Sequence, residues 1–171
     1  VIKTQDETLS REELIAIYDE AHKGGLRVAS HIYAADAVET ALEAGLGPYD
    51  TIEHIGVNQD TNYNDNIVRL IVDNQVAMAP TIIALEGVKM IIEDPSLVDD
   101  DKWRRDIPAE DLFADIQSSY RESDLSTHPI FLRSEADRNG RFSKLKHLYD
   151  NGALFAVSSD SGTRGNPHHN A

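Results

Sequence analysis

Hydrophobic and polar positions follow two alternating periods along the chain. Short segments rich in β-branched residues recur between longer segments whose apolar residues are spaced by three and four. This order predicts a parallel sheet covered by helices, because successive parallel strands need a crossover connection. Five strands are expected, over residues 1–4, 26–31, 50–54, 76–81 and 153–159.

The first predicted helix has clear boundaries. Ser10 is suited to cap its start, Glu13 completes a capping box, and Gly24–Gly25 end it. A second helix is expected to stop at Gly45, and a third to cover residues 65–74. The apolar positions predicted to be buried are Leu14, Ile17, Tyr18 and Ala21 in the first helix, Val38, Ala41 and Leu42 in the second, and Ile67, Leu70 and Ile71 in the third.

Residues 84–151 depart from this rhythm, because the interval before the last strand is several times longer than the earlier ones. We expect a helical insertion there, with helices over 84–93, 109–120 and 129–149 and an exposed acidic loop near Asp99. We also expect the chain to be part of a longer polypeptide. Its first residue already lies in a predicted strand, and no helix closes the last one.

Composition excludes several classes of function. The 30 acidic and 16 basic residues give a net charge of −14, which disfavours nucleic-acid and membrane partners. No apolar run approaches the roughly 18 residues of a spanning helix, so we expect a soluble protein. The cytoplasm is favoured as its location, and a secreted or periplasmic one stays open. Cysteine is absent, so any metal must be bound by histidine and carboxylate.

Reactive side chains recur where predicted strands end. Lys3, His31, His54 and Asp160 each lie at or just after such an end, and these ends meet on one face of a parallel sheet. Imidazole and carboxylate are favoured ligands of Zn²⁺ and similar ions. Taken singly, each residue has an ordinary alternative: a core or surface histidine, a solvated lysine, or an aspartate that shapes a turn. Four such positions together favour a metal site.

The segments around these residues resemble the amidohydrolase superfamily, and more narrowly its branch of imidazolonepropionase-like enzymes and metal-dependent Xaa-Pro dipeptidases. Leu26–Tyr33 and Thr51–His54 look like the strand-five and strand-six signatures of that family. Val157–Gly162 looks like its strand-eight aspartate motif, and Val1–Thr4 matches the strand-four position of its carboxylated lysine. The resemblance covers almost the whole chain and is weakest over residues 84–151.

The resemblance implies an α/β fold, a partial (β/α)₈ TIM-like barrel. Residues 1–171 would form strands four to eight of an incomplete catalytic domain, with residues 84–151 as a helical insertion within it. It also implies a hydrolase that cleaves an amide or other C–N bond through a metal-activated hydroxide. The substrate would be a small molecule, either dipeptide-like or a cyclic amide, and the cofactor one or two divalent ions, with Zn²⁺ expected.

The same resemblance assigns roles to individual residues. Lys3 would be a carboxylated bridge between two metals, and His31 and His54 would bind one ion. Asp160 would be both a metal ligand and the general base. Tyr33 and His168 would contact the substrate, with a packing tyrosine and a solvated loop histidine as the ordinary alternatives.

Two departures from the family pattern leave other functions open. The chain lacks the His-x-His pair of the family's first strand, and no glycine-rich segment follows Lys3. We therefore expect the 171 residues alone to be inactive. The alternatives are a mononuclear deaminase-type enzyme with Lys3 as a bystander, a non-catalytic binding domain derived from a barrel, and an unrelated doubly wound α/β fold. Substrate identity and a homo-oligomeric state stay open.

Overall fold

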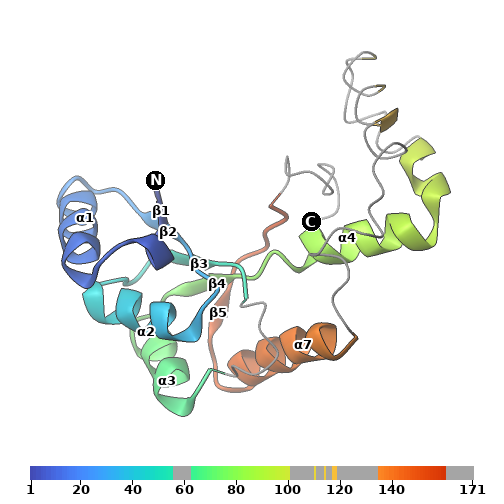
Figure 1. Cartoon of the computed structure of the whole chain (residues 1–171). Helices are drawn as coiled ribbons and strands as arrows, with labels where there is room; N and C mark the ends of the chain where they lie inside the picture. The colour runs from blue at the N-terminus through green and yellow to red at the C-terminus, as the bar shows by residue number, and fades with distance from the viewer. Residues whose placement is uncertain (56–62, 101–109, 111–113, 115–116, 119–134, 161–171) are drawn as a thin grey trace. The chain divides into compact units, whose positions relative to one another are not determined.

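The computed structural model describes residues 1–55, 63–100, 110, 114, 117–118 and 135–160. These residues include a five-stranded sheet in which every neighbouring pair of strands is parallel (Figure 1). The strands lie side by side in sequence order, without the reversal that marks a doubly wound sheet. The doubly wound alternative is therefore wrong. The strands are β1 (Ile2–Gln5), β2 (Val28–His31), β3 (Thr51–Glu53), β4 (Ala77–Ala79) and β5 (Leu154–Phe155).

The chain divides into two compact units. The first consists of Val1–Pro80 with Ser134–Val157 and contains the whole sheet. Among its helices, α1 packs on α2 and α2 packs on α3 (Figure 1). The helices are α1 (Arg11–Lys23), α2 (Ala35–Ala44), α3 (Asp65–Asp73) and α7 (Glu135–Asp150), with the short 3₁₀ helix η1 (Asp6–Thr8) after β1.

Helix α1 begins and ends where the sequence predicts. The Ser10 hydroxyl accepts a hydrogen bond from the Glu13 N–H, and the Glu13 carboxylate accepts one from the Ser10 N–H at 2.8 Å. These bonds lower the pKa of the Glu13 carboxyl, because they stabilise its charged form. Helix α2 ends at Gly45, whose φ of 121° favours glycine. The predicted caps are confirmed.

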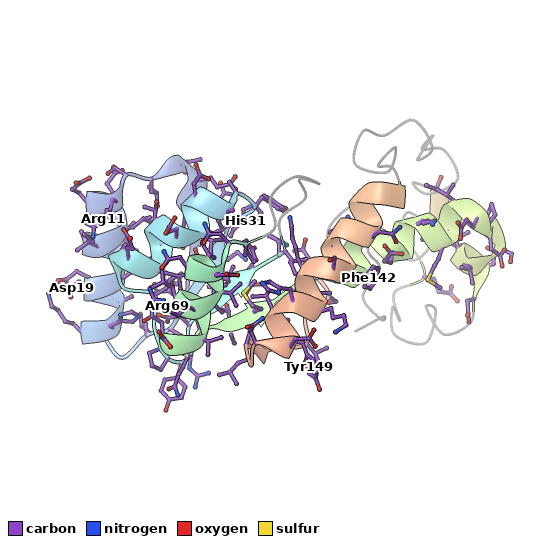
Figure 2. All side chains as sticks on the ribbon, turned by 90° about the horizontal axis from the view of Figure 1, so that it is seen from below. Arg11, Asp19, His31, Arg69, Phe142 and Tyr149 are labelled. Atoms are coloured by element: carbon purple, nitrogen blue, oxygen red, sulfur yellow. The ribbon has the colours of Figure 1, made fainter. Side chains whose placement is uncertain are left out.

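The helices bury most of the positions that their apolar periodicity predicts, with a departure in α1, where Ile17 is only half-buried, and an exchange in α3. Leu70 is only half-buried there, whereas Val68 is 4% exposed and joins the core. The outer sides of the helices carry charged residues, such as Arg11 and Asp19 on α1 and Arg69 on α3 (Figure 2). The first unit therefore has one apolar core and a polar helical surface.

The last two strands are shorter than predicted. β5 pairs only with Ala77 and Met78 of β4, and one further hydrogen bond joins the Ala156 N–H to the Met78 carbonyl. Pro80 has no N–H to donate, and Thr81 adopts a left-handed conformation with φ of 47°. The ladder therefore ends before residue 81.

The second unit consists of Thr81–Arg133 with Ser158–Ala171. It contains α4 (Ile82–Glu93) and the 3₁₀ helix η2 (Pro95–Asp99), so the helix predicted over 84–93 is confirmed. The helix predicted over 109–120 lies largely outside the described residues. The one predicted over 129–149 is confirmed over most of its length by α7, and only its residues 129–134 lie outside the described part. The bounds of the insertion, 84–151, stay a prediction. Among the described residues, no helix is both long enough and apolar enough to cross a membrane.

Candidate metal-binding site at the carboxyl ends of the strands

The strand register brings reactive side chains of β1, β2 and β3 to one face of the sheet. His31, the last residue of β2, pairs with Glu53 of β3, and Lys3 of β1 pairs with Ala29 of β2. Along β2, Val28 and Ser30 are buried against the helices, so Ala29 and His31 point to the opposite face. Lys3 and Glu53 share that face, because residues paired in register lie on the same side of a sheet.

His31 and His54 form the centre of this group. The Nδ1 of His31 and the Nε2 of His54 face each other at 2.8 Å, and the rings meet edge to face with centroids 4.5 Å apart. His54 follows β3 directly and is only 6% exposed. Between the two facing nitrogens there is room for one proton, so at least one nitrogen presents a lone pair to the other.

The backbone at His54 is held in an unusual conformation. Its φ is 73°, in the left-handed region, which costs a non-glycine residue about 1–3 kcal/mol. Its N–H donates to the Ala79 carbonyl at 2.8 Å, so β4 fixes this geometry. The strained conformation turns the imidazole toward His31, as expected where the position of a side chain matters more than local stability.

Tyr33 completes a cluster of three rings. Its ring stacks on His54 with centroids 4.8 Å apart and an angle of 11° between the planes. It meets the His31 ring edge to face at 4.7 Å. The predicted site residues His31, His54 and Tyr33 are therefore neighbours in the structure. Tyr33 packs in this way whether or not it also contacts a substrate.

Lys3 lies on the same face, paired with an acidic residue that the sequence did not single out. Its Nζ is 3.9 Å from Glu53 Oε2, and Glu53 Oε1 accepts a hydrogen bond from the Thr51 hydroxyl at 2.7 Å. The Lys3 side chain is 52% exposed, so the ion pair contributes little to stability. The position of Glu53, immediately before His54 at a strand end, was the signal that could have identified it.

The structure does not place the two remaining predicted residues relative to this cluster. Asp160 belongs to the second unit, where it is exposed and has a φ of 53°. His168 lies outside the described residues. Within the described part of the chain, no group of three or more histidine and acidic side chains is arranged to hold a metal.

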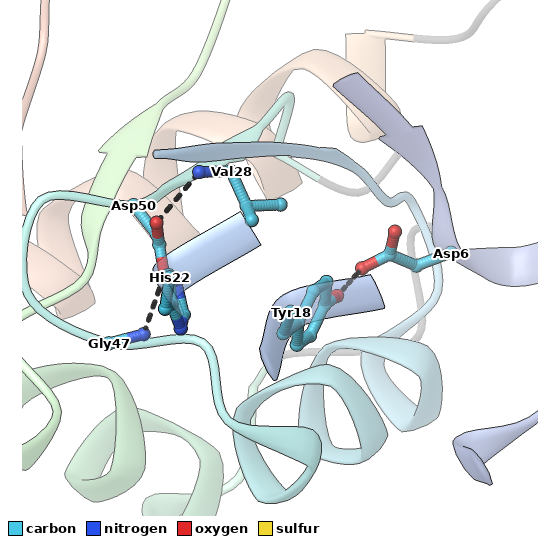
Figure 3. Close-up of polar contacts among 6 residues, drawn as sticks. All are labelled: Asp6, Tyr18, His22, Val28, Gly47 and Asp50. Atoms are coloured by element: carbon cyan, nitrogen blue, oxygen red, sulfur yellow. Dashed lines mark hydrogen bonds and ion pairs between the residues drawn. The ribbon is translucent and has the colours of Figure 1, made fainter. Parts of the chain in front are cut away.

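Two acidic residues of η1 contact the His31 segment, and the sequence alone did not indicate them. The Asp6 carboxylate accepts hydrogen bonds from the Tyr18 hydroxyl (Figure 3) and from the Ser30 hydroxyl. Glu7 Oε1 accepts from the backbone N–H groups of Tyr33 and Ala34, both at 2.6 Å. These contacts join the loop after β1 to both sides of His31.

A third histidine, His22, lies at the opposite end of the sheet. Asp50, which is 1% exposed, accepts hydrogen bonds from His22 Nε2 at 2.8 Å, from the Val28 N–H at 2.8 Å and from the Gly47 N–H at 3.0 Å (Figure 3). An open cavity of 440 Å³ lies beside these residues. The polar side chains that line it are already engaged, since the Arg27 guanidinium lies 5.5 Å from the centroid of the Tyr49 ring.

Comparison with known proteins by sequence gives uncharacterized relatives. No protein-family model matches the chain. Uncharacterized proteins of Mycobacterium bovis and Mycobacterium tuberculosis are 35% identical to it over 78 residues. The match covers 46% of this chain and only 19% of each mycobacterial protein.

Comparison by structure identifies enzymes. The chain is similar to a Xaa-Pro dipeptidase with methionine bound in its active site, with a TM-score of 0.54, 19% identity and 93% of the chain covered. It is also similar to a prolidase complexed with N-methylphosphonate-L-proline (TM-score 0.55, 17% identity, 89% covered). A. niger ochratoxinase gives a TM-score of 0.57 at 13% identity, with 92% covered. The chain spans 30%, 28% and 27% of these three proteins.

The structural likeness confirms the predicted fold class. The five-stranded parallel α/β sheet matches part of the TIM barrels of amidohydrolases, the superfamily that the sequence motifs resemble. At these levels of identity the likeness concerns the fold alone. The function of this chain must be argued from its own residues.

Proposed function

We propose that this chain is part of a metal-dependent hydrolase that cleaves an amide or other C–N bond. The observation that carries the proposal is the pair of imidazole nitrogens, His31 Nδ1 and His54 Nε2, which face each other at the carboxyl ends of adjacent parallel strands. The known enzymes with this fold, a Xaa-Pro dipeptidase and a prolidase, favour a peptide-like substrate. A cyclic amide is the other expected substrate.

The two histidines fit a divalent ion. Zinc–nitrogen bonds of about 2.0–2.1 Å at a tetrahedral angle place two ligand nitrogens roughly 3.3 Å apart. The observed 2.8 Å between His31 and His54 therefore needs only a small widening. Lys3, carboxylated at its Nζ, and Asp160 would complete the ligand set. A bound ion would supply an activated water and polarise the substrate carbonyl.

The other residues of the chain would orient the substrate and move protons. Asp160 would take the proton of the attacking water and give it to the leaving nitrogen, the role of a carboxylate within hydrogen-bonding reach of that water. Tyr33, stacked on His54, would place its hydroxyl beside the substrate. His168 would contact the substrate from the loop after Asp160.

One observation favours a second candidate, a single-ion enzyme of the deaminase type. Lys3 Nζ lies 3.9 Å from Glu53 Oε2, a contact that suits a protonated ammonium group. A lysine carbamate is an anion and would be repelled by Glu53 unless cations lay between them. In this candidate Lys3 is a bystander. Two ions per site, with loss of one in Lys3→Ala, would favour the binuclear enzyme; one ion, with Lys3→Ala fully active, would favour the single-ion enzyme.

The proposal is tested by screening the full-length, zinc-loaded protein for hydrolysis of dipeptides, N-acyl amino acids and small lactams. We expect turnover that a chelator removes and added zinc restores. His54→Ala should abolish it, whereas His147→Ala, which removes an exposed histidine of α7, should leave it unchanged. Equal activity in His54→Ala and the unmodified protein would contradict the assignment. A protein that binds no metal and is inactive would favour the alternative of a non-catalytic binding domain.

A further inference from the structure

We propose that Asp6 and Glu7 are positioning residues that hold the segment bearing His31 and Tyr33 in its ligand-binding geometry. The inference rests on the proposed function for what the segment binds, but its geometric basis is independent of that function. Both carboxylates come from η1, directly after the strand that carries Lys3. They lie more than twenty residues before the segment that they contact.

Asp6 holds the segment on the amino-terminal side of His31. Its carboxylate is 2% exposed and accepts a hydrogen bond from the hydroxyl of Ser30, which is fully buried and immediately precedes His31. The same carboxylate oxygen accepts from the Tyr18 hydroxyl of α1. Burial raises the pKa of Tyr18, and the bond to Asp6 adds to the shift, so this hydroxyl remains a donor at neutral pH. Ser30 is thereby tied to both η1 and α1.

Glu7 holds the segment on the carboxyl-terminal side. Its Oε1 accepts from the N–H groups of Tyr33 and Ala34, both at 2.6 Å. Ala34 is the N-cap residue of α2 and has no side chain able to cap the helix. Glu7 therefore provides the negative charge that favours a helix start, from 27 residues away. Hydrogen bonds to a carboxylate are stronger than neutral ones, so this end of the segment is firmly fixed.

The two contacts leave little freedom between them. Ser30 is fixed by Asp6, Tyr33 and Ala34 are fixed by Glu7, and Ile32 is fully buried. The backbone at His31 is thus restrained on both sides. Because the His31 ring must meet His54 within hydrogen-bonding distance, a small shift of this backbone would separate the two nitrogens.

The Glu7 contact can be tested without disturbing the core, since Glu7 is exposed. In the full-length protein, titration with Co²⁺ alone should show a loss of affinity of about tenfold or more in Glu7→Ala, as found when groups that orient metal ligands are removed. Glu7→Gln keeps an acceptor oxygen and should restore most of it. Glu12→Ala removes the same charge from the first turn of α1 and should leave the affinity unchanged.

A second readout needs no metal. In the metal-free protein, the proton between His31 and His54 can be followed in ¹H–¹⁵N spectra of the histidine rings. Glu7→Ala should make this proton exchange with water about tenfold faster, and Glu12→Ala should not. Unchanged exchange and unchanged Co²⁺ affinity in Glu7→Ala would overturn the role of Glu7.

The Asp6 contact is tested by removing its two donors separately. Ser30→Ala breaks the bond next to His31, whereas Tyr18→Phe breaks the bond to α1 at the same carboxylate. We expect Ser30→Ala to speed proton exchange at the histidine pair and to weaken Co²⁺ binding more than Tyr18→Phe does. If Ser30→Ala and Tyr18→Phe change proton exchange and Co²⁺ affinity equally, and only in proportion to the stability that each variant loses, Asp6 has a purely structural role.

The two proposals fail in distinguishable ways. If the unmodified protein binds no Co²⁺, the proposed function fails, but the exchange of the histidine proton still tests the positioning role. If the protein binds Co²⁺ through His31 and His54, and neither Glu7→Ala nor Ser30→Ala changes affinity or exchange, the positioning role fails alone.

Discussion

Histidines lie at both ends of the same sheet, and their surroundings differ. At the amino end, His22 binds Asp50, a buried carboxylate that also accepts two backbone N–H groups. At the carboxyl end, His31 and His54 face each other, with one proton to share between the two nitrogens. In the His22–Asp50 pair, the carboxylate oxygens also accept hydrogen bonds from the backbone. In the His31–His54 pair, at least one ring nitrogen directs its lone pair at the space between the two rings.

The difference teaches that the partner of a histidine indicates its role better than the histidine itself. Asp50 joins the loops that precede β2 and β3, because its three donors come from α1, the start of β2 and the loop before β3. This network stabilises the fold. The His31–His54 pair, by contrast, includes a residue with a strained backbone, His54, and lies beside the ring of Tyr33, features that cost stability or specify position. We expect stability to depend on one end and ligand binding on the other.

The largest effect is expected at the amino end. Asp50→Ala leaves the Val28 and Gly47 N–H groups without their acceptor, one of them buried, and should lower the free energy of unfolding by about 3–4 kcal/mol. Urea denaturation of the full-length protein measures the loss. Asp50→Asn keeps one acceptor oxygen and should lose less. If Asp50→Ala lowers the free energy of unfolding by less than about 1 kcal/mol, the structural role of the His22–Asp50 network is contradicted.

The next effect separates the two histidine pairs by metal affinity. His31→Ala should weaken Zn²⁺ binding by about 100-fold, which corresponds to about 2.7 kcal/mol, because one of few ligands is lost. His22→Ala should change the affinity less than threefold, although it lowers stability. Calorimetric titration with Zn²⁺ measures the affinity of both variants. Equal losses of Zn²⁺ affinity in His31→Ala and His22→Ala would contradict the different roles given to the two ends of the sheet.

A smaller effect concerns the start of α1, which follows η1 at the carboxyl end. Ser10→Ala removes the N-cap hydroxyl and should lower the free energy of unfolding by about 1 kcal/mol without changing Zn²⁺ affinity. Ser143→Ala, at an exposed position within α7, should cause no loss. Reduced Zn²⁺ affinity in Ser10→Ala would show that stability and ligand binding are not separate at this end.

The smallest effect is the pH dependence of the same cap. The folded protein has a Glu13 pKa below its ordinary value of 4.5, because the Ser10 bonds favour the carboxylate. The stabilisation is therefore complete above pH 4.5 and is lost as the pH falls through the folded pKa. The stability difference between the unmodified protein and Glu13→Ala should vanish in acid. A difference that persists below this range would contradict the capping role.

Local features of the fold followed from the sequence. The start of α1 depends on Ser10 and Glu13, which are three residues apart, so their contact is fixed as soon as a helix forms there. The places of His31 and His54 followed from the rule that parallel strands present their carboxyl ends on one face. Strand ends were less predictable. β4 is short because Pro80 has no N–H to donate and Thr81 adopts a left-handed conformation, and β5 is short because it pairs only with Ala77 and Met78 of β4.

The residues missed by sequence reasoning all act over long distances along the chain. Asp6 contacts a residue 24 positions later, Glu7 one 26 positions later, and His22 one 28 positions later. No local spacing indicates such pairs, since they depend on the register between strands and the packing of α1. A shift of one residue in β2 would turn His31 to the helix side and break the contacts of Asp6 and Glu7 together.

The sequence by itself therefore determined the order of the strands and of the helices around them, the caps, and the two histidines at strand ends, whereas Lys3 lies within β1, two residues before its end. Only the tertiary structure decided that the facing ring nitrogens of His31 and His54 lie 2.8 Å apart, that Glu53 forms an ion pair with Lys3, and that His22 is hydrogen-bonded to Asp50. The physical reason is the range of the interactions. Periodicity and capping act within a turn or two of the backbone, whereas the partner of each reactive side chain is set by strand register and by the burial of residues far apart in the chain.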